Sequence, residues 1–245
     1  MMLINAYKHL YRDCCSDRDF MNCAPFVAKK GKYYSSNSRR LLLIGRATNG
    51  WGSAETVKSE ASFIDEVIKQ TNESDGFAWI ENQNGILRIP GNTGYSLSRS
   101  SFWNYARNIW MLLPGDVQNS PVWMDNIAWT NLYKLAPVAK GNPSRVMIEK
   151  QVSACVDILW EEIKLLNPTH ILVMSGYDWF RPFEGIFQNV IESEEKNHLS
   201  GRRKNQVYVE GTGVYNNIPV VVTCRPELRS KEKFVEQAVH YLLKM

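Results

Sequence analysis

The stretch VSACVDILWEEIKLLNPTHILVMSG, residues 152–176, joins a helix pattern directly to a strand pattern. Its first part repeats apolar residues at helical spacing and ends at Pro168, and its second part, THILVMSG, is a short apolar run that stops at a glycine. Short apolar runs without polar alternation are typical of strands that are buried on both faces of a parallel sheet. The order of the two patterns therefore predicts an α/β fold.

Three further runs have the same character and end in turn or polar residues. They are RLLLIGR at residues 40–46, MDNIAWTNLYK at 124–134 and IPVVVTC at 218–224. Helical patterns accompany them at residues 55–70, 98–110 and 230–245. Strands that alternate with helices call for a parallel sheet with right-handed crossovers. We therefore expect three layers, α/β/α, around a central four-stranded parallel sheet.

The chain is expected to contain one such domain, over residues 39–245, preceded by a short helix and a basic arm in residues 1–38. The arm, AKKGKYYSSNSRR from residue 28 onward, is polar and basic rather than apolar. Residues 205–217, NQVYVEGTGVYNN, are expected to form an edge strand and a glycine-rich turn before the last strand.

Composition limits the environment of the protein. A chain of 245 residues with 44% hydrophobic content can bury a sizeable core, and its formal charge of +4 permits an anionic partner without requiring one. No apolar run approaches the roughly 18 residues of a membrane span, and the N-terminal sequence lacks the features of a secretion signal. We expect a soluble cytoplasmic protein without a membrane partner. Its five cysteines, an odd number, are expected to be free thiols.

Ligands of open α/β sheets bind outside the carboxyl ends of the strands. Four polar segments follow the predicted strands at those ends. They are GRATNGW at residues 45–51, TNLYK at 130–134, MSGYDW at 174–179 and CRPELR at 224–229. The sequence therefore predicts a ligand site where these segments meet.

At these strand ends the sequence resembles the uracil-DNA glycosylase superfamily, most nearly its bacterial and archaeal branches. The matching segments are LLLIGRATNGW with Gly45, TNLYK at residues 130–134, CVDILWEEIKLLNPTHILVMSG at 155–176 and VVVTCRPELRSK at 220–231. They occur in the family's order from about residue 41 to the C-terminus. The resemblance implies a uracil-DNA glycosylase-like fold, a positively charged groove for DNA and a pocket that receives an extruded base.

Asn131 stands where the family has its base-reading asparagine. Its amide offers one acceptor and two donors, which match the alternating groups on the edge of a pyrimidine. The alternative is a turn residue that bonds its own backbone after the strand. Gly45 and Arg46 are expected beside the base, and Trp51 is the first candidate for the ring on which it stacks, ahead of Phe63 and Tyr95. Other tryptophans are expected in the core.

Two residues carry the predicted chemistry. Asn49 follows the strand-end glycine, where the resemblance implies a residue that orients the attacking water, although an asparagine cannot accept a proton. Arg225 replaces the family's histidine before a proline, and its guanidinium can stabilise negative charge on a departing base. The alternatives are a helix-entry turn at Asn49 and, at Arg225, a surface arginine beside phosphate or an acidic neighbour such as Glu227.

Lys134 and Arg229 are the basic residues expected to contact a nucleic-acid backbone, with DNA as the partner. No cofactor is expected. The relatives with an iron–sulfur cluster have four cysteines, whereas Leu135 occupies the third position here and Cys14 and Cys15 are adjacent. The sequence also lacks the cysteine and histidine spacings of zinc sites, so no metal is expected.

Three hypotheses of function follow. The first is a DNA glycosylase-like protein that binds an extruded, deaminated or modified base and hydrolyses its N-glycosidic bond. The second is a nucleic-acid or nucleobase binding module that has lost hydrolysis, because an acidic residue is missing and Arg225 replaces histidine. The third is an α/β enzyme that acts on a free nucleotide, since fold alone does not fix function. The sequence leaves the identity of the base and the oligomeric state open.

Overall fold

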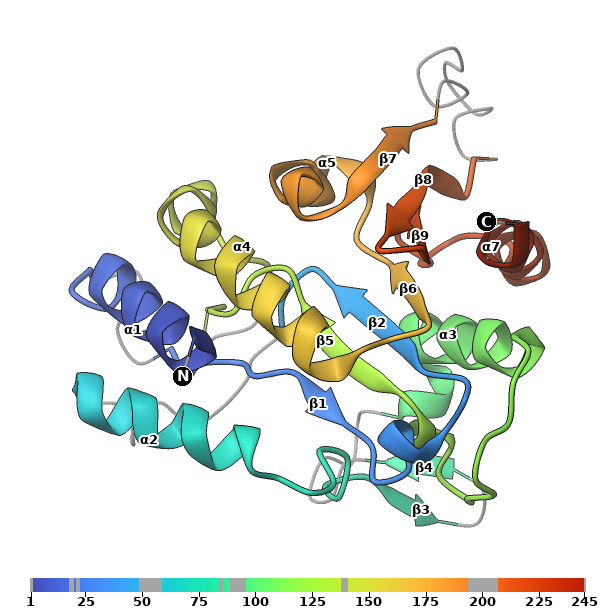
Figure 1. The fold of residues 1–245 in the computed structure, drawn as a ribbon, viewed down its shortest axis with the longest axis horizontal. Coiled ribbons are helices and arrows are strands. Elements are labelled where there is room, and N and C mark those ends of the chain that lie inside the picture. Colours follow the sequence, from blue (N-terminus) through green and yellow to red (C-terminus); the bar gives the residue numbers. More distant parts are fainter. Residues whose placement is uncertain are drawn as a thin grey trace.

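A seven-stranded mixed sheet forms the centre of the fold in the computed structural model of the protein (Figure 1). The structure describes residues 2–17, 20, 23–48, 59–83, 86–88, 96–137, 141–193 and 207–244. The strands of this sheet are β1 (Lys29–Lys30), β2 (Leu41–Gly45), β5 (Ala128–Asn131), β6 (His170–Val173), β7 (Gln188–Glu192), β8 (Val209–Tyr215) and β9 (Ile218–Thr223). A separate hairpin consists of β3 (Glu81–Gln83) and β4 (Ile86–Arg88).

Helices cover both faces of the sheet. They are α1 (Met2–Cys14), α2 (Glu60–Thr71), α3 (Ser101–Leu112), α4 (Arg145–Leu166), the short α5 (Tyr177–Phe180) and α7 (Lys231–Lys244). Figure 1 shows α1, α2 and α4 on one side of the central strands and α3 and α7 on the other. Short 3₁₀ segments occupy Tyr34–Ser36, Leu97–Arg99, Trp123–Asn126 and Arg181–Ile186.

The apolar strand runs are explained by burial on two sides. Along β2, Leu42 and Ile44 pack into the cluster that contains α1, α2 and α4, whereas Leu41 and Leu43 pack into the cluster that contains α3 and α7. Because successive side chains of a strand point to opposite faces, a strand between two helical layers must be apolar throughout. All five residues of β2 are accordingly buried.

The sheet is larger than the predicted four strands. The strands β5, β2, β6 and β9 are parallel neighbours in that order, and each coincides with one of the four apolar runs. The short β1 adds to β5 in antiparallel fashion, and β8 and β7 continue the sheet beyond β9 in the same way. The outcome is a mixed α/β sheet in place of a purely parallel one.

The predicted glycine-rich turn is also wrong. The turn between β8 and β9 is formed by Asn216 and Asn217, whose φ values of 48° and 67° lie in the left-handed region that hairpin turns require. Gly211 instead lies inside β8, at a position where a Cβ would collide with the Tyr177 ring. The strand is not an edge strand either, since β7 pairs with its free side.

Residues 1–38 do not form a separate arm. Helix α1 packs on α4 and α2, and Leu3, Tyr7 and Leu10 belong to the main core cluster. Lys29, in the segment predicted to be a basic arm, is 3% exposed, and its Nζ lies 2.7 Å from the Glu73 carboxylate. The predicted boundary at residue 38 therefore divides a single core.

Candidate functional site

The carboxyl ends of β2 and β5 bring two of the predicted residues together. Gly45 is the register partner of Asn131, and a Cβ at position 45 would collide with the Asn131 side-chain oxygen. The backbone of Gly45 does not have a positive φ, so space rather than conformation requires glycine. The absence of a side chain at 45 is what lets the Asn131 amide lie against β2.

An aromatic ring lies beside this pair. The Phe102 Cε2 atom is 3.7 Å from the point that a Cβ of Gly45 would occupy. Phe102 is half-buried in the first turn of α3 and is held edge-to-face against Trp103, with 4.9 Å between the ring centroids. An amide and an aromatic ring therefore flank the end of β2.

Sequence reasoning missed Phe102 and considered other rings. Phe63 lies in the core against Tyr7 and Tyr11, so it is not the ring beside Gly45. Trp51 and Tyr95, like the predicted catalytic Asn49, lie outside the described residues. The sequence signal that could have indicated Phe102 is its position two residues after Ser100, the N-cap of α3. This position places the ring in the first turn of that helix, which lies near the end of β2.

The Asn131 amide is buried with a donor unused. The residue is 1% exposed, and its Nδ2 has no hydrogen-bond partner among the described residues. A buried donor without a partner costs about 1–3 kcal/mol, so such groups are rare in native proteins and mark strain or a function. The alternative of an asparagine whose amide satisfies its own turn does not account for this free Nδ2.

Lys134 occupies a different place from the one predicted. Its side chain is fully buried, and Nζ lies 2.6 Å from Glu162 Oε2 and 2.7 Å from both Thr130 Oγ1 and the Asn131 carbonyl oxygen. An ammonium group enclosed in this way does not reach a phosphate, so the predicted backbone contact is wrong. Lys134 instead fixes the main chain that carries the Asn131 amide.

Glu162 completes this buried network from α4. Its Oε1 accepts hydrogen bonds from the Tyr7 hydroxyl at 3.1 Å and from the Ala28 amide at 3.0 Å, and its Oε2 also accepts from Thr130 Oγ1 at 2.6 Å. Burial and the neighbouring Glu162 carboxylate raise the pKa of Tyr7 well above its ordinary value. Both oxygens of the carboxylate are satisfied, which a buried charge requires.

Arg46 lies at the same edge of the sheet, one residue after Gly45. Its Nε donates to the Ser175 carbonyl oxygen at the end of β6, and its guanidinium carbon is 4.7 Å from the ring centroid of Trp179. Burial, followed by the neighbouring charge of Arg225, lowers the pKa of Arg46 to about 10. The guanidinium remains charged at neutral pH and occupies one face of the Trp179 indole.

Arg225 follows β9, on the same edge of the sheet but three strands from Asn131. At a spacing of about 4.8 Å per strand, this separation is roughly 14 Å between the strands. Its guanidinium makes two bonds to Glu227, of 3.0 and 2.6 Å, and both side chains are 46% exposed. Arg229 is half-buried in the following loop, where its carbonyl accepts the Tyr105 hydroxyl at 2.7 Å.

The site therefore consists of two parts that share one sheet edge. The amide of Asn131, Gly45 and the Phe102 ring form the first part, and the guanidinium groups of Arg46 and Arg225 form the second. The first part sets an amide beside an aromatic ring at the end of β2. The second provides positive charge toward the end of β9.

Other reactive groups offer little chemistry. All five cysteines are free, and burial raises the pKa of the Cys155 thiol to about 12, which keeps it protonated at neutral pH. The part of the chain that the structure describes contains no cluster of three or more His, Cys, Asp or Glu side chains that could hold a metal ion. Among the described helices, none combines the length and the apolar character that a membrane crossing requires.

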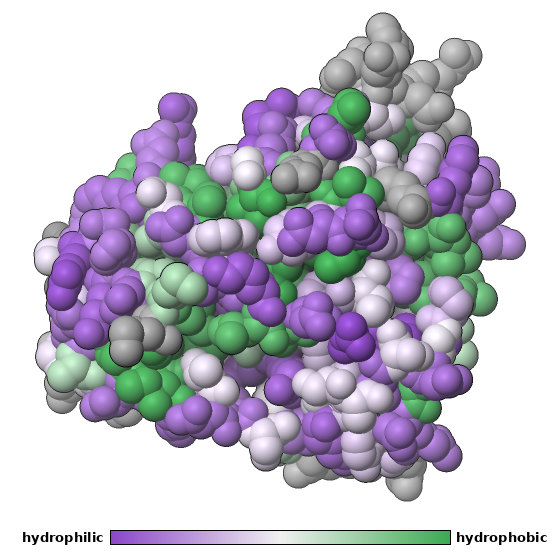
Figure 2. All heavy atoms as spheres, in the orientation of Figure 1, coloured by the Kyte–Doolittle hydropathy of each residue, from purple (hydrophilic) through white to green (hydrophobic). Residues whose placement is uncertain are grey.

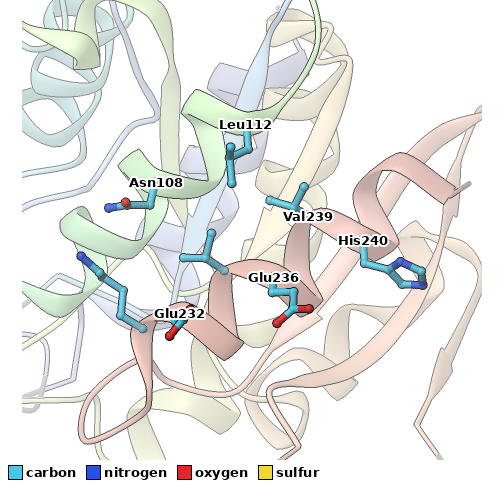
Figure 3. A pocket seen from close by; sticks show the side chains of 8 residues that line it. Asn108, Leu112, Glu232, Glu236, Val239 and His240 are labelled. Atoms are coloured by element: carbon cyan, nitrogen blue, oxygen red, sulfur yellow. The ribbon is translucent and has the colours of Figure 1, made fainter.

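A hollow of about 690 Å³ lies away from the strand ends, between α3 and α7 (Figure 3). Leu112 and Val239 face each other across it, and Glu232 and Glu236 stand along α7. Figure 2 shows one face of the molecule, in the orientation of Figure 1, on which apolar patches lie among hydrophilic side chains. Because none of the strand-end residues borders the α3–α7 hollow, we do not assign it to the candidate site.

Comparison of the sequence with protein-family models and with curated proteins finds no match to either.

Proposed function

We propose that the protein binds an extruded nucleobase of DNA at the carboxyl ends of β2 and β5, as a uracil-DNA glycosylase-like protein. The observation that carries the proposal is the buried Asn131 amide, whose Nδ2 lacks a partner among the described residues and whose Oδ1 lies against Gly45, near the Phe102 ring. A protein that acts on a base takes it out of the stack, bonds its edge and holds its face against an aromatic ring. The proposal also uses the four parallel strands β5, β2, β6 and β9, whose carboxyl ends carry the segments on which the resemblance was based.

The energies of these contacts are adequate for recognition. Stacking of a base on an aromatic ring contributes roughly 1–3 kcal/mol and tolerates any base. A bond from the Asn131 amide to a ligand carbonyl would restore the hydrogen bond that the free protein lacks, and it would select ligands that present an acceptor at that point. Phe102 thus supplies affinity and Asn131 supplies selectivity.

Hydrolysis is the reaction that we assign to this site. The oxygen of a water molecule bonds to the C1′ carbon of the deoxyribose, the N-glycosidic bond breaks, and its electron pair leaves with the base. The proton that the water loses passes to solvent, and the base takes up a proton from solvent. The positive charges of Arg46 and Arg225 on this sheet edge would favour the departing base as an anion, with Asn49 as the residue proposed to orient the water. The exposed Arg225–Glu227 pair is worth little in water, so an anion can compete for the guanidinium.

The second candidate is base binding without hydrolysis. The pairing of Arg225 with Glu227 favours this candidate, because the guanidinium is already bonded to a carboxylate in the free protein. The two candidates share the contacts of Asn131 and differ only in turnover.

The deciding experiment compares the wild type with Asn131→Ala and with Asn72→Ala, an exposed asparagine at the end of α2. Single-stranded oligonucleotides that contain uracil or hypoxanthine are tested for binding at low salt and for release of free base. We expect Asn131→Ala to lower binding about tenfold or more, as the loss of one buried hydrogen bond predicts, and Asn72→Ala to leave it unchanged.

Release of free base by the wild type would establish the glycosylase, and tight binding without release would establish the binding module. Absence of binding to every oligonucleotide at low salt, or equal binding by Asn131→Ala and the wild type, would overturn the proposal.

A further inference from the structure

A second hollow, of about 770 Å³, runs along the outer face of α3. It lies between that helix, residues 117–121 and the β3–β4 hairpin, and this volume is within the range of roughly 300–1,000 Å³ of small-molecule sites. Six of the residues that line it carry carboxamides, which are Asn82, Asn104, Asn108, Gln118, Asn119 and Asn126. Carboxamides provide donors and acceptors without charge.

Among the described residues that line this hollow, Arg107, exposed on α3, is the one with a charged side chain. The Asp125 carboxylate, which accepts a hydrogen bond from the lining residue Ser120, is paired with Lys32. Ligands with an anionic group are favoured over cations by such a lining. The hollow between α3 and α7 differs, since Lys231, Glu232 and Glu236 give it both signs.

One residue that lines the hollow, Trp110, has a hydrogen-bond donor without a partner among the described residues. Trp110 is 9% exposed, and this donor, Nε1, is buried. The indole packs against Trp123 at 5.7 Å, and the Arg39 guanidinium carbon lies 5.4 Å from its ring. The ring is therefore held in place, and its buried N–H has no partner among the described residues.

The amides of the wall are held by bonds to the main chain. Asn108 Nδ2 donates to the Asn104 carbonyl at 2.7 Å, and Asn104 Nδ2 donates to the Ser98 carbonyl at 3.2 Å. Such bonds fix rotamers before a ligand arrives, which lowers the entropy lost on binding. The indole rings of the floor are more than nine-tenths buried, so this hollow has no exposed indole platform of the kind that binds the apolar face of a sugar.

We propose that this hollow binds a nucleotide, with a carbonyl oxygen of the base on Trp110 Nε1 and the phosphate on Arg107. The two residues are three positions apart on α3, so their side chains lie on one face of the helix. The base edge finds further donors and acceptors in the carboxamides. The same chemistry is present in a free mononucleotide and in a nucleotide of a single strand, and the site is independent of the one at Asn131.

The test is calorimetric titration of the full-length protein with uridine 5′-monophosphate, with uridine and with a short oligothymidylate. We expect saturable binding of the monophosphate and at least tenfold weaker binding of uridine, because uridine lacks the phosphate. Trp110→Phe keeps an aromatic ring but removes the N–H, and it should weaken the monophosphate about tenfold. Arg107→Gln should abolish the difference between monophosphate and uridine. Stronger binding of the oligothymidylate than of the monophosphate would identify a strand as the source of the nucleotide.

One control separates loss of this site from a general effect of removing positive charge. Arg145→Gln removes an arginine that is 91% exposed on α4 and should bind the monophosphate like the wild type. Arg107 is exposed, so its variant tests the proposal even if Trp110→Phe lowers stability. Absence of saturable binding, or unchanged binding of the monophosphate by Arg107→Gln, would overturn the second site.

Discussion

At the scale of single residues, the site depends on a glycine at position 45, which has no side chain. Gly45 leaves room for the Asn131 amide, and that amide is buried with an unsatisfied donor. A residue retained for stability alone would not be expected to leave a polar group in this state, since it lowers the free energy of unfolding. At this contact, the stability of the protein and the proposed binding of a base therefore make opposite demands on Asn131.

Gly45→Ala is expected to destabilise the protein by about 1–3 kcal/mol, because the added methyl group must displace the Asn131 side chain. Asn131→Ala should have little effect on stability or raise it, because it removes a buried donor without a partner. The double variant should be more stable than the sum of the two changes predicts, since Asn131→Ala removes the collision. Urea denaturation measures all three, and strictly additive effects would show that the two side chains do not interact.

At the scale of elements, a buried ion pair ties β5 to α4. The Lys134–Glu162 pair, with Thr130 and the Tyr7 hydroxyl, joins the strand that carries Asn131 to the longest helix and to α1. This network fixes the direction in which the β5 carboxyl end leaves the sheet. It explains why Lys134, which was predicted to contact a nucleic-acid backbone, is fully buried instead.

Lys134→Met is expected to lower the free energy of unfolding by about 3–5 kcal/mol, because it leaves the Glu162 carboxylate buried without its cation. The double variant Lys134→Met/Glu162→Gln should lose less than the two single variants together. Arg145→Met breaks the exposed Arg145–Glu149 pair on the same helix and should change stability little. Chemical denaturation provides the comparison, and a neutral Lys134→Met would contradict a structural role for the pair.

At the scale of the whole molecule, the N-terminal segment is part of the core. Helix α1 contributes Leu3, Tyr7 and Leu10 to the cluster beneath the sheet, and β1 forms its first strand. The order of strands in space differs from their order in the chain, so the sheet is complete only when both ends of the sequence have joined it.

A chain of residues 39–245 is therefore expected not to fold cooperatively, because it exposes the surface that α1 covers and removes two of the donors to Glu162. Near-ultraviolet circular dichroism and thermal denaturation check this outcome against the full-length chain. Addition of a separate peptide of residues 1–38 should restore part of the native signal. A cooperative transition of the shortened chain at the wild-type midpoint would show that the segment is dispensable.

The sequence by itself determined the α/β character and the positions of the four parallel strands. Runs such as LLLIG at β2 are apolar because both faces are buried, and that requirement is written into consecutive residues. Helices α1 and α7 were also predicted from a local pattern, because their apolar residues recur at the spacing of helical turns.

Only the tertiary structure decided which residues meet. Phe102 reaches Gly45 from another helix, Lys134 turns inward to a carboxylate 28 positions away, and Lys29 enters the sheet. Periodicity reports which side of an element is buried but not what covers it, because contacts between distant segments depend on how the elements pack. The strand ends could thus be predicted from the sequence, whereas the partners gathered there are a property of the fold.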